Sequence, residues 1–197
     1  MKNKKVIIIY ILIFIFLLCG CNNQHINSTN VESDNKESLK SSDLWDKKVR
    51  FLAETYCKQF ENPEQLNKEY LLKVCQYYKT LSISNLEYNE ELKKYIITID
   101  EVKDIVKNLF GIYDFEYTDS KYYDKYNGLY LFDDYPSLIN DNVYTDFDIT
   151  KIDDTRMQFT VAIKDTTTGV ENTQVYILKK DNNTNDYFIT SMHLLFL

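Results

Sequence analysis

The chain is poor in the residues on which many catalytic sites depend. Its 197 residues include four glycines, two prolines and two histidines. No Gly-x-Ser-x-Gly elbow of a serine hydrolase occurs. A cysteine nucleophile would need a histidine base, and only His193 follows the N-terminal region, inside an apolar segment where a histidine is more often a rim or core residue. We therefore expect no catalytic residue, no metal site and no cofactor.

The chain is poor in arginine as well, and its acidic residues outnumber its basic residues. Arg50 and Arg156 are the only arginines, and the formal net charge is −7. Affinity for nucleic acid comes largely from basic residues that displace counterions, so this composition argues against nucleic acid as a partner. Arginine and alanine are rare while Lys, Asn, Ile and Tyr abound, a bias typical of AT-rich coding that also bears on how the tyrosines are interpreted.

The longest apolar run is too short to span a membrane. Residues 6–18 form an apolar stretch of 13 residues after three lysines, whereas a spanning helix needs about 20. The run is typical of a secretion signal. It ends in Leu18-Cys19-Gly20-Cys21, which resembles the bacterial lipoprotein signal Leu-x-Gly-Cys. The resemblance implies transfer of a diacylglyceryl group, with chains such as palmitate, to Cys21, cleavage before that residue, and acylation or exposure of its new amino terminus. It also implies a location on the extracytoplasmic face of the cell membrane.

Three segments follow from this interpretation. Residues 1–20 are the predicted signal peptide, with an uncleaved N-terminal anchor as the alternative. Residues 21–42 comprise the lipidated cysteine and a disordered tether rich in Asn and Ser, with a mean reach of roughly 25 Å. Residues 43–197 have the size of a single domain. Removal of the signal leaves 20 basic against 30 acidic residues, a net charge near −10.

Periodicity predicts three helices in the first half of the domain. Apolar residues at steps of three and four predict a helix over residues 43–60. Asn62 is a good N-cap for a second helix over residues 63–81, which begins with proline. Residues 98–111 begin with a capping box and end with glycine, which predicts the third helix.

Strands are predicted in the second half. Alternating aromatic residues indicate a strand at residues 113–117, and Asn127-Gly128 indicates a tight hairpin. Four apolar runs with short turns over residues 143–195 predict an antiparallel meander. The predicted class is α+β, with about three N-terminal helices packed on a curved antiparallel sheet. This layout is similar to NTF2-like (nuclear transport factor 2-like) and cystatin-like folds, an analogy that carries no function.

Two cysteines lie in the predicted domain, Cys57 and Cys75. In the predicted helical hairpin they are offset by about 12 Å along the axis, whereas a disulfide needs Cα atoms within about 7 Å. Two buried free thiols are therefore favoured. A disulfide is the alternative if the second helix begins later than Pro63.

Tyrosines are concentrated in one segment, where seven occur within 23 residues from Tyr113 to Tyr135 among several aspartates. A tyrosine ring has a flat apolar face and a hydroxyl, which suit protein interfaces and sugar rings. Coding bias combined with the strand preference of aromatic residues is the alternative explanation. If the cluster is functional, the predicted interaction patch consists of Tyr122, Tyr123, Tyr126 and Tyr130.

The sequence thus favours a lipid-anchored, acidic, non-enzymatic domain that binds an envelope protein through the tyrosine-rich segment or the sheet face. The alternative is a cone-shaped pocket for a small ligand or a cell-wall glycan, and an envelope enzyme comes third. A cavity lined by Tyr and Asp would favour the ligand, whereas a flat exposed aromatic patch would favour the protein partner.

Overall fold

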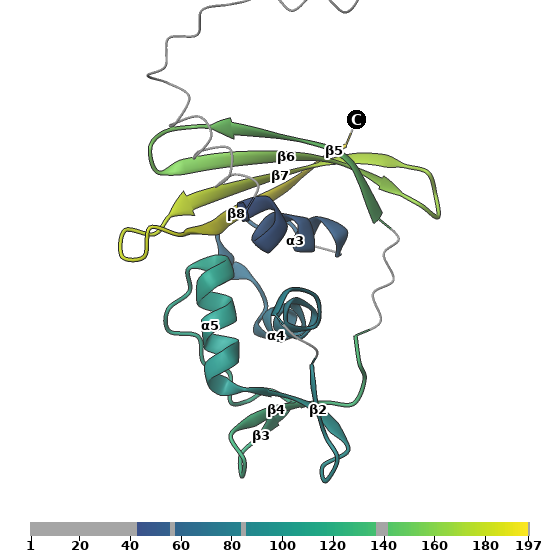
Figure 1. Cartoon of the computed structure of the whole chain (residues 1–197), viewed down its shortest axis with the longest axis vertical. Helices are drawn as coiled ribbons and strands as arrows, with labels where there is room; N and C mark the ends of the chain where they lie inside the picture. Colours follow the sequence, from purple (N-terminus) through teal and green to yellow (C-terminus); the bar gives the residue numbers. More distant parts are fainter. Residues whose placement is uncertain (1–42, 56–57, 84–85, 137–141, 197) are drawn as a thin grey trace, which may run out of the picture. The chain divides into compact units, whose positions relative to one another are not determined.

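The protein has an α+β fold in which helices lie between two antiparallel sheets of four strands each (Figure 1). The computed structural model describes residues 43–55, 58–83, 86–136 and 142–196. The predicted signal peptide and tether lie outside these residues. Within the described ranges, no helix has the length and apolar character needed to cross a membrane.

The first helical segment is shorter than predicted. A π-helical turn, η1 (Trp45–Val49), leads into helix α3 (Arg50–Glu54), which ends because Thr55 adopts extended backbone angles, φ −102° and ψ 160°. The prediction of a helix to Phe60 was wrong. Phe60 instead exchanges two backbone hydrogen bonds with Met192, of 3.0 and 2.9 Å. Pairing with a distant strand thus overrides the helical spacing of its apolar side chain.

The second helix begins five residues later than predicted. Asn62 caps only a single 3-10 turn, η2 (Pro63–Gln65), and the chain then becomes extended at Leu66, with ψ 137°. Helix α4 (Lys68–Tyr78) starts after Asn67, whose side chain accepts two backbone N–H bonds of the first turn. Two good N-caps follow each other closely here, and the second of them begins the longer helix.

The third predicted helix is confirmed as α5 (Ile99–Phe110). Thr98 and Glu101 form the capping box, and Gly111 ends the helix in the left-handed conformation, with φ 67°. Glu101 also accepts a 2.6 Å hydrogen bond from Lys79, a buried lysine that begins the π-helical turn η3 (Lys79–Ile83) after α4. This ion pair joins the start of α5 to the end of α4.

Replacement of Glu101 by glutamine tests this ion pair through its pH dependence. Burial alone would raise the pKa of Glu101, but hydrogen bonds from Lys79 and Thr98 lower it below the ordinary value of 4.5. A carboxylate with a lowered pKa stabilises the fold above its unfolded-state pKa, and that contribution is lost as the pH falls through the folded-state pKa. We expect Glu101→Gln to cost roughly 0.5–1 kcal/mol at pH 7.

The measurement is urea denaturation, followed by the fluorescence of Trp45, the single tryptophan. The difference in the free energy of unfolding between wild type and Glu101→Gln should fall toward zero as the pH is lowered. Glu91→Gln, a change of the same charge at an exposed turn position, serves as the control and should show little difference at any pH. A Glu101→Gln effect that does not change with pH would contradict the role of the ion pair.

The smaller sheet has the order β1-β2-β4-β3. Its strands are β1 (Glu87–Asn89), β2 (Lys94–Thr98), β3 (Tyr123–Asp124) and β4 (Leu129–Phe132). The hairpin at Asn127-Gly128 is confirmed, since it joins β3 to β4. The sequence predicted no strands before the third helix, and the predicted strand at residues 113–117 is absent from this described segment, where bends and loops occur instead.

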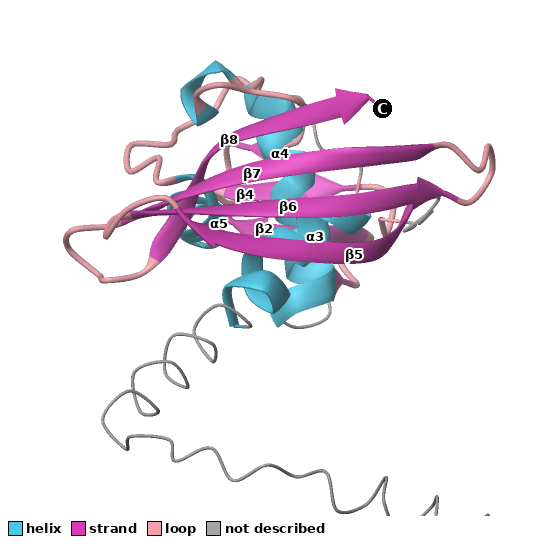
Figure 2. Ribbon diagram, turned by 90° about the horizontal axis from the view of Figure 1, so that it is seen from above, coloured by secondary structure: helices cyan, strands magenta, loops and turns pink. Residues whose placement is uncertain are grey.

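The larger sheet is the predicted meander, in the order β5-β6-β7-β8 (Figure 2). Its strands are β5 (Asn142–Lys151), β6 (Arg156–Asp165), β7 (Glu171–Lys180) and β8 (Tyr187–Phe196). The chain therefore builds two sheets where the sequence predicted one, and β1 and β2 precede α5, so the helices do not all come first. Trp45 packs under β5, stacked on Phe147 at 4.2 Å between ring centroids.

The core lies between the sheets. Leu52, Leu72, Val106, Phe159 and Ile189 have no exposed surface, and they come from α3, α4, α5, β6 and β8. Side chains of this kind fill the space between the helices and the larger sheet. A cone-shaped fold would have its pocket between the helices and the larger sheet, where these side chains lie. The pocket described below lies instead at the smaller sheet.

Candidate functional site

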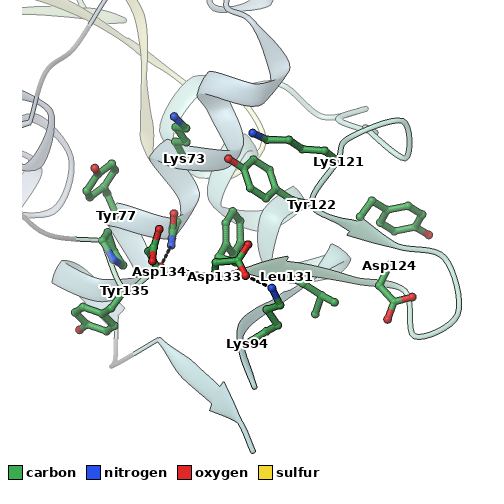
Figure 3. A pocket seen from close by; sticks show the side chains of 14 residues that line it. Lys73, Tyr77, Lys94, Lys121, Tyr122, Asp124, Leu131, Asp133, Asp134 and Tyr135 are labelled. Carbon is green, nitrogen blue, oxygen red and sulfur yellow. Dashed lines mark hydrogen bonds and ion pairs between the residues drawn. The ribbon is translucent and has the colours of Figure 1, made fainter. Parts of the chain in front are cut away.

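A pocket of about 640 Å³ lies between α4 and the smaller sheet (Figure 3). Its volume is within the range of small-molecule sites. We call it the α4–β4 pocket. Its described lining consists of Lys73, Gln76, Tyr77, Lys94, Lys121, Tyr122, Tyr123, Asp124, Leu131, Phe132, Asp133, Asp134, Tyr135 and Pro136.

One wall of the pocket is a face of α4. Lys73, Gln76 and Tyr77 are three and four positions apart, which places them on the same side of the helix. The side-chain amide of Gln76 donates a 2.8 Å hydrogen bond to the backbone carbonyl of Asp134. This bond holds the segment after β4 against the helix and so fixes the width of the pocket at that point.

The facing wall is formed by β4 and the residues that follow it. Alternation along β4 buries Tyr130 and Phe132, while Leu131 is less buried. Lys94 of β2 forms an ion pair with Asp133. Because the Asp133 side chain is 74% exposed, this pair contributes little to stability, and it brings one positive and one negative charge together at the pocket.

Aromatic contacts hold the tyrosines of the lining in place. Tyr122 packs against Phe132 at 5.0 Å between ring centroids, and the ammonium of Lys121 lies 4.8 Å from the centre of the Tyr122 ring. Tyr135 meets Tyr95 edge to face at 5.3 Å. These ring pairs restrict the side chains before any ligand binds, so the pocket presents rigid flat faces.

The charges of the pocket are balanced. The described lining contains three lysines and three aspartates. Lys94 is paired with Asp133, whereas no ion pair among the described residues joins Lys73 or Lys121 to a carboxylate. A polar ligand without large net charge therefore suits the pocket as a whole.

The predicted tyrosine patch does not form one surface. Tyr122 and Tyr123 are half-buried and line the pocket. Tyr126 is 99% exposed at the tip of the β3–β4 hairpin. Tyr130 is a correction to the prediction, since only 2% of it is exposed and its hydroxyl donates to the carbonyl of Tyr117 at 3.2 Å. Its position facing inward on β4 makes it a core residue.

The remaining tyrosines of the cluster have separate roles. Tyr113 is exposed and donates a hydrogen bond to Asp181, and the hydroxyl of Tyr117 donates to Glu69 at 3.3 Å. Tyr135 lines the pocket. The tyrosines that are concentrated in this part of the sequence are therefore divided among the pocket lining, the core and the loops.

The residues considered for nucleophilic chemistry are not assembled among the described residues. Cys57 lies outside them. Cys75 is fully buried, its Sγ is 3.9 Å from the carbonyl oxygen of Val102, and burial raises the pKa of its thiol far above the usual range. His193 lies on β8, with Nδ1 3.6 Å from a carboxylate oxygen of Glu61. A thiol held protonated in a core is chemically inert.

The N-terminal predictions concern residues beyond the described ranges. The lipidation site Cys21 and the cleavage motif formed by Leu18, Cys19 and Gly20 both lie there. Within the described ranges, no group of three or more His, Cys, Asp or Glu side chains is arranged to hold a metal ion.

Sequence reasoning missed most of the pocket. Lys73, Gln76 and Tyr77 fall within the predicted second helix, but none of them is predicted as a site residue. Asp133 and Asp134 are among the aspartates of the tyrosine-rich segment and are not predicted as site residues either. The sequence does place Lys73, Gln76 and Tyr77 on one side of a helix, which could have indicated the pocket wall. A buried glutamine within a helix needs a hydrogen-bond partner from another element.

Comparisons with known proteins identify no relative: no family model matches the chain, and no curated protein or solved structure matches it either.

Proposed function

We propose that the protein is a lipid-anchored, extracytoplasmic binding protein that takes a polar saccharide in the α4–β4 pocket. The observation that carries the proposal is the combination of preorganised tyrosine faces with amide and charged groups in one pocket of about 640 Å³. Ligand sites of this size use a few convergent polar groups to fix orientation.

The lining favours a saccharide over an apolar ligand. Tyr77, Tyr122 and Tyr135 offer flat faces on which the C–H side of a sugar ring can lie. Asp134 offers carboxylate oxygens that accept hydrogen bonds from hydroxyl groups, whereas the carboxylate of Asp124 already accepts bonds from the Tyr126 N–H and the Asn127 amide in the β3–β4 turn. A mostly apolar molecule would leave these charged groups desolvated without partners, which is unfavourable.

The sequence supports the proposed location. Lipidation at Cys21 would hold the protein on the outer face of the membrane, and a tether of residues 22–42 would let the domain reach roughly 25 Å into the envelope. Saccharide polymers are abundant there. A binding role, rather than catalysis, is also proposed, because the buried Cys75 thiol and the separately paired His193 offer no nucleophile with a base.

Replacement of Tyr122 by leucine tests the pocket. We expect Tyr122→Leu to weaken saccharide binding roughly tenfold, because it removes a ring face and a hydroxyl from the wall, a loss of about 1.4 kcal/mol. The measurement is isothermal titration calorimetry of the full chain in detergent with muramidase-solubilised cell-wall fragments. Circular dichroism confirms that the variant is folded.

Tyr126→Leu is the matched control, since it makes the same chemical change at a tyrosine that is 99% exposed and outside the lining. It should bind as wild type does. Wild-type protein that binds no fragment, or a Tyr122→Leu variant with unchanged affinity, would refute the proposal.

A protein partner in the envelope is the second candidate, and Tyr126 favours it. A fully exposed aromatic ring at a hairpin tip is suited to contact another protein. Crosslinking in intact cells separates the two candidates. Loss of a crosslinked partner in Tyr126→Leu, with wild-type fragment binding, would support the protein interface.

A further inference from the structure

Two lysines at one end of the α4–β4 pocket have no carboxylate partner among the described residues. Figure 3 shows Lys73 and Lys121 at the same end as Tyr122, whereas Lys94 and Asp133 are joined to each other farther along the pocket. Lys73 comes from α4 and Lys121 from the loop before β3. Elements distant in sequence thus bring two ammonium groups to one end of the pocket.

The carboxylate that could neutralise Lys73 is engaged elsewhere. Glu69 precedes Lys73 by four residues on α4, the spacing at which a helical ion pair forms. Instead, Glu69 Oε1 accepts hydrogen bonds from Ser120 at 3.0 Å and Tyr117 at 3.3 Å, and Glu69 Oε2 is buried. Its carboxylate is directed into the protein, so it leaves the Lys73 ammonium available to a ligand.

The second lysine is held by the ring beneath it. The Lys121 ammonium lies 4.8 Å from the centroid of the Tyr122 ring, which attracts it through the negative face of the aromatic system. This contact positions the charge beside the pocket without neutralising it. An ammonium over a ring remains able to donate hydrogen bonds to an anionic ligand.

We propose that the Lys73–Lys121 end of the pocket binds the anionic group of an acidic saccharide, a sugar or polyol that carries a carboxylate or a phosphate. This inference rests on the proposed saccharide-binding function. The uncharged part of the ligand then lies on Tyr122 and Tyr77, and its hydroxyl groups reach Asp134. Charge-assisted hydrogen bonds from two ammonium groups to one anion are stronger than neutral ones.

Two disaccharides that differ in one anionic group test the inference. N-acetylglucosaminyl-N-acetylmuramic acid carries a lactyl carboxylate, and N,N′-diacetylchitobiose has the same backbone without it. We expect the full chain in detergent to bind the acidic disaccharide at least tenfold more tightly in calorimetry. A glycerol phosphate oligomer is titrated in parallel, and its tighter binding would identify phosphate as the source of the anion.

The variant that combines Lys73→Gln with Lys121→Gln should bind the acidic disaccharide and N,N′-diacetylchitobiose with the same affinity. Lys103→Gln with Lys125→Gln is the control, because it removes the same charge at two exposed positions outside the lining. Its preference for the acidic ligand should equal that of wild type.

The outcomes separate this inference from the proposed function. If wild-type protein binds both disaccharides equally, or if the control variant loses the preference as fully as the pocket variant, the anion site is refuted while saccharide binding stands. If neither disaccharide nor the glycerol phosphate oligomer binds, saccharide binding itself is refuted.

Discussion

Replacement of Gly111 by alanine is expected to lower the free energy of unfolding by about 3 kcal/mol. Gly111 ends α5 with φ 67°, a conformation that costs roughly 1–2 kcal/mol for a residue with a β-carbon. A β-carbon here would also lie 2.6 Å from Cδ2 and 2.8 Å from Cγ of Phe188. Because Cγ is among the close atoms, rotation of the ring about the Cβ–Cγ bond cannot relieve the contact, and either χ1 of Phe188 or the backbone of β8 must change.

Gly169→Ala isolates the backbone contribution. Gly169 has φ 73° and nothing within 4 Å of a β-carbon, so alanine should cost about 1 kcal/mol there. The free energy of unfolding of each variant is measured by urea denaturation, and the difference between the two costs gives the contribution of the contact with Phe188. A double-mutant cycle with Phe188→Ala should show that part of the Gly111→Ala cost disappears. Equal costs at Gly111 and Gly169 would contradict the close contact.

Replacement of Lys48 by methionine is expected to cost about 3 kcal/mol. Lys48 is 5% exposed, and its ammonium donates to the carbonyls of Asn108, at 2.8 Å, and Tyr187, and to the carboxylate of Asp186 at 2.9 Å. It thereby joins η1 to the last turn of α5 and to the start of β8. Methionine fills a similar volume but removes the bonds that the ammonium donates to two carbonyls and a carboxylate, and the loss of a buried hydrogen bond costs about 1–3 kcal/mol.

The neighbouring lysine provides the control. Lys47 forms an ion pair with Asp43 at 2.8 Å, and both side chains are more than half exposed. Lys47→Met should therefore change the free energy of unfolding by less than about 0.5 kcal/mol. Urea denaturation of both variants checks the difference. A Lys48→Met variant as stable as Lys47→Met would show that the buried ammonium contributes nothing to the fold.

Local features of the fold could be predicted from the sequence where neighbouring residues determine them. The capping box at Thr98 and Glu101 and the glycine at position 111 set both ends of α5 without help from other elements. The helix predicted to Phe60 failed because a backbone pairing with Met192, far along the chain, decides the conformation there. Apolar spacing carries no information about such a pairing.

The pocket depends on the same kind of distant contact. Gln76 and Asp134 are 58 residues apart, and their hydrogen bond determines where β4 meets α4. Tyr122, Tyr123 and Tyr130 were all predicted as interaction residues because tyrosine is concentrated in this part of the sequence. Tyr130 lies in the core, however, although its sequence neighbourhood is as rich in tyrosine. Only its inward position on β4 distinguishes it.

Hydrogen–deuterium exchange of the full chain in detergent, with and without muramidase-solubilised cell-wall fragments, tests the central claim most directly. Binding in the α4–β4 pocket predicts slower exchange in residues 73–77, 121–124 and 131–136, because the ligand restricts opening of the segments that line it. Unchanged exchange in these segments, or protection confined to the hairpin tip at Tyr126 and to the larger sheet, would contradict the claim.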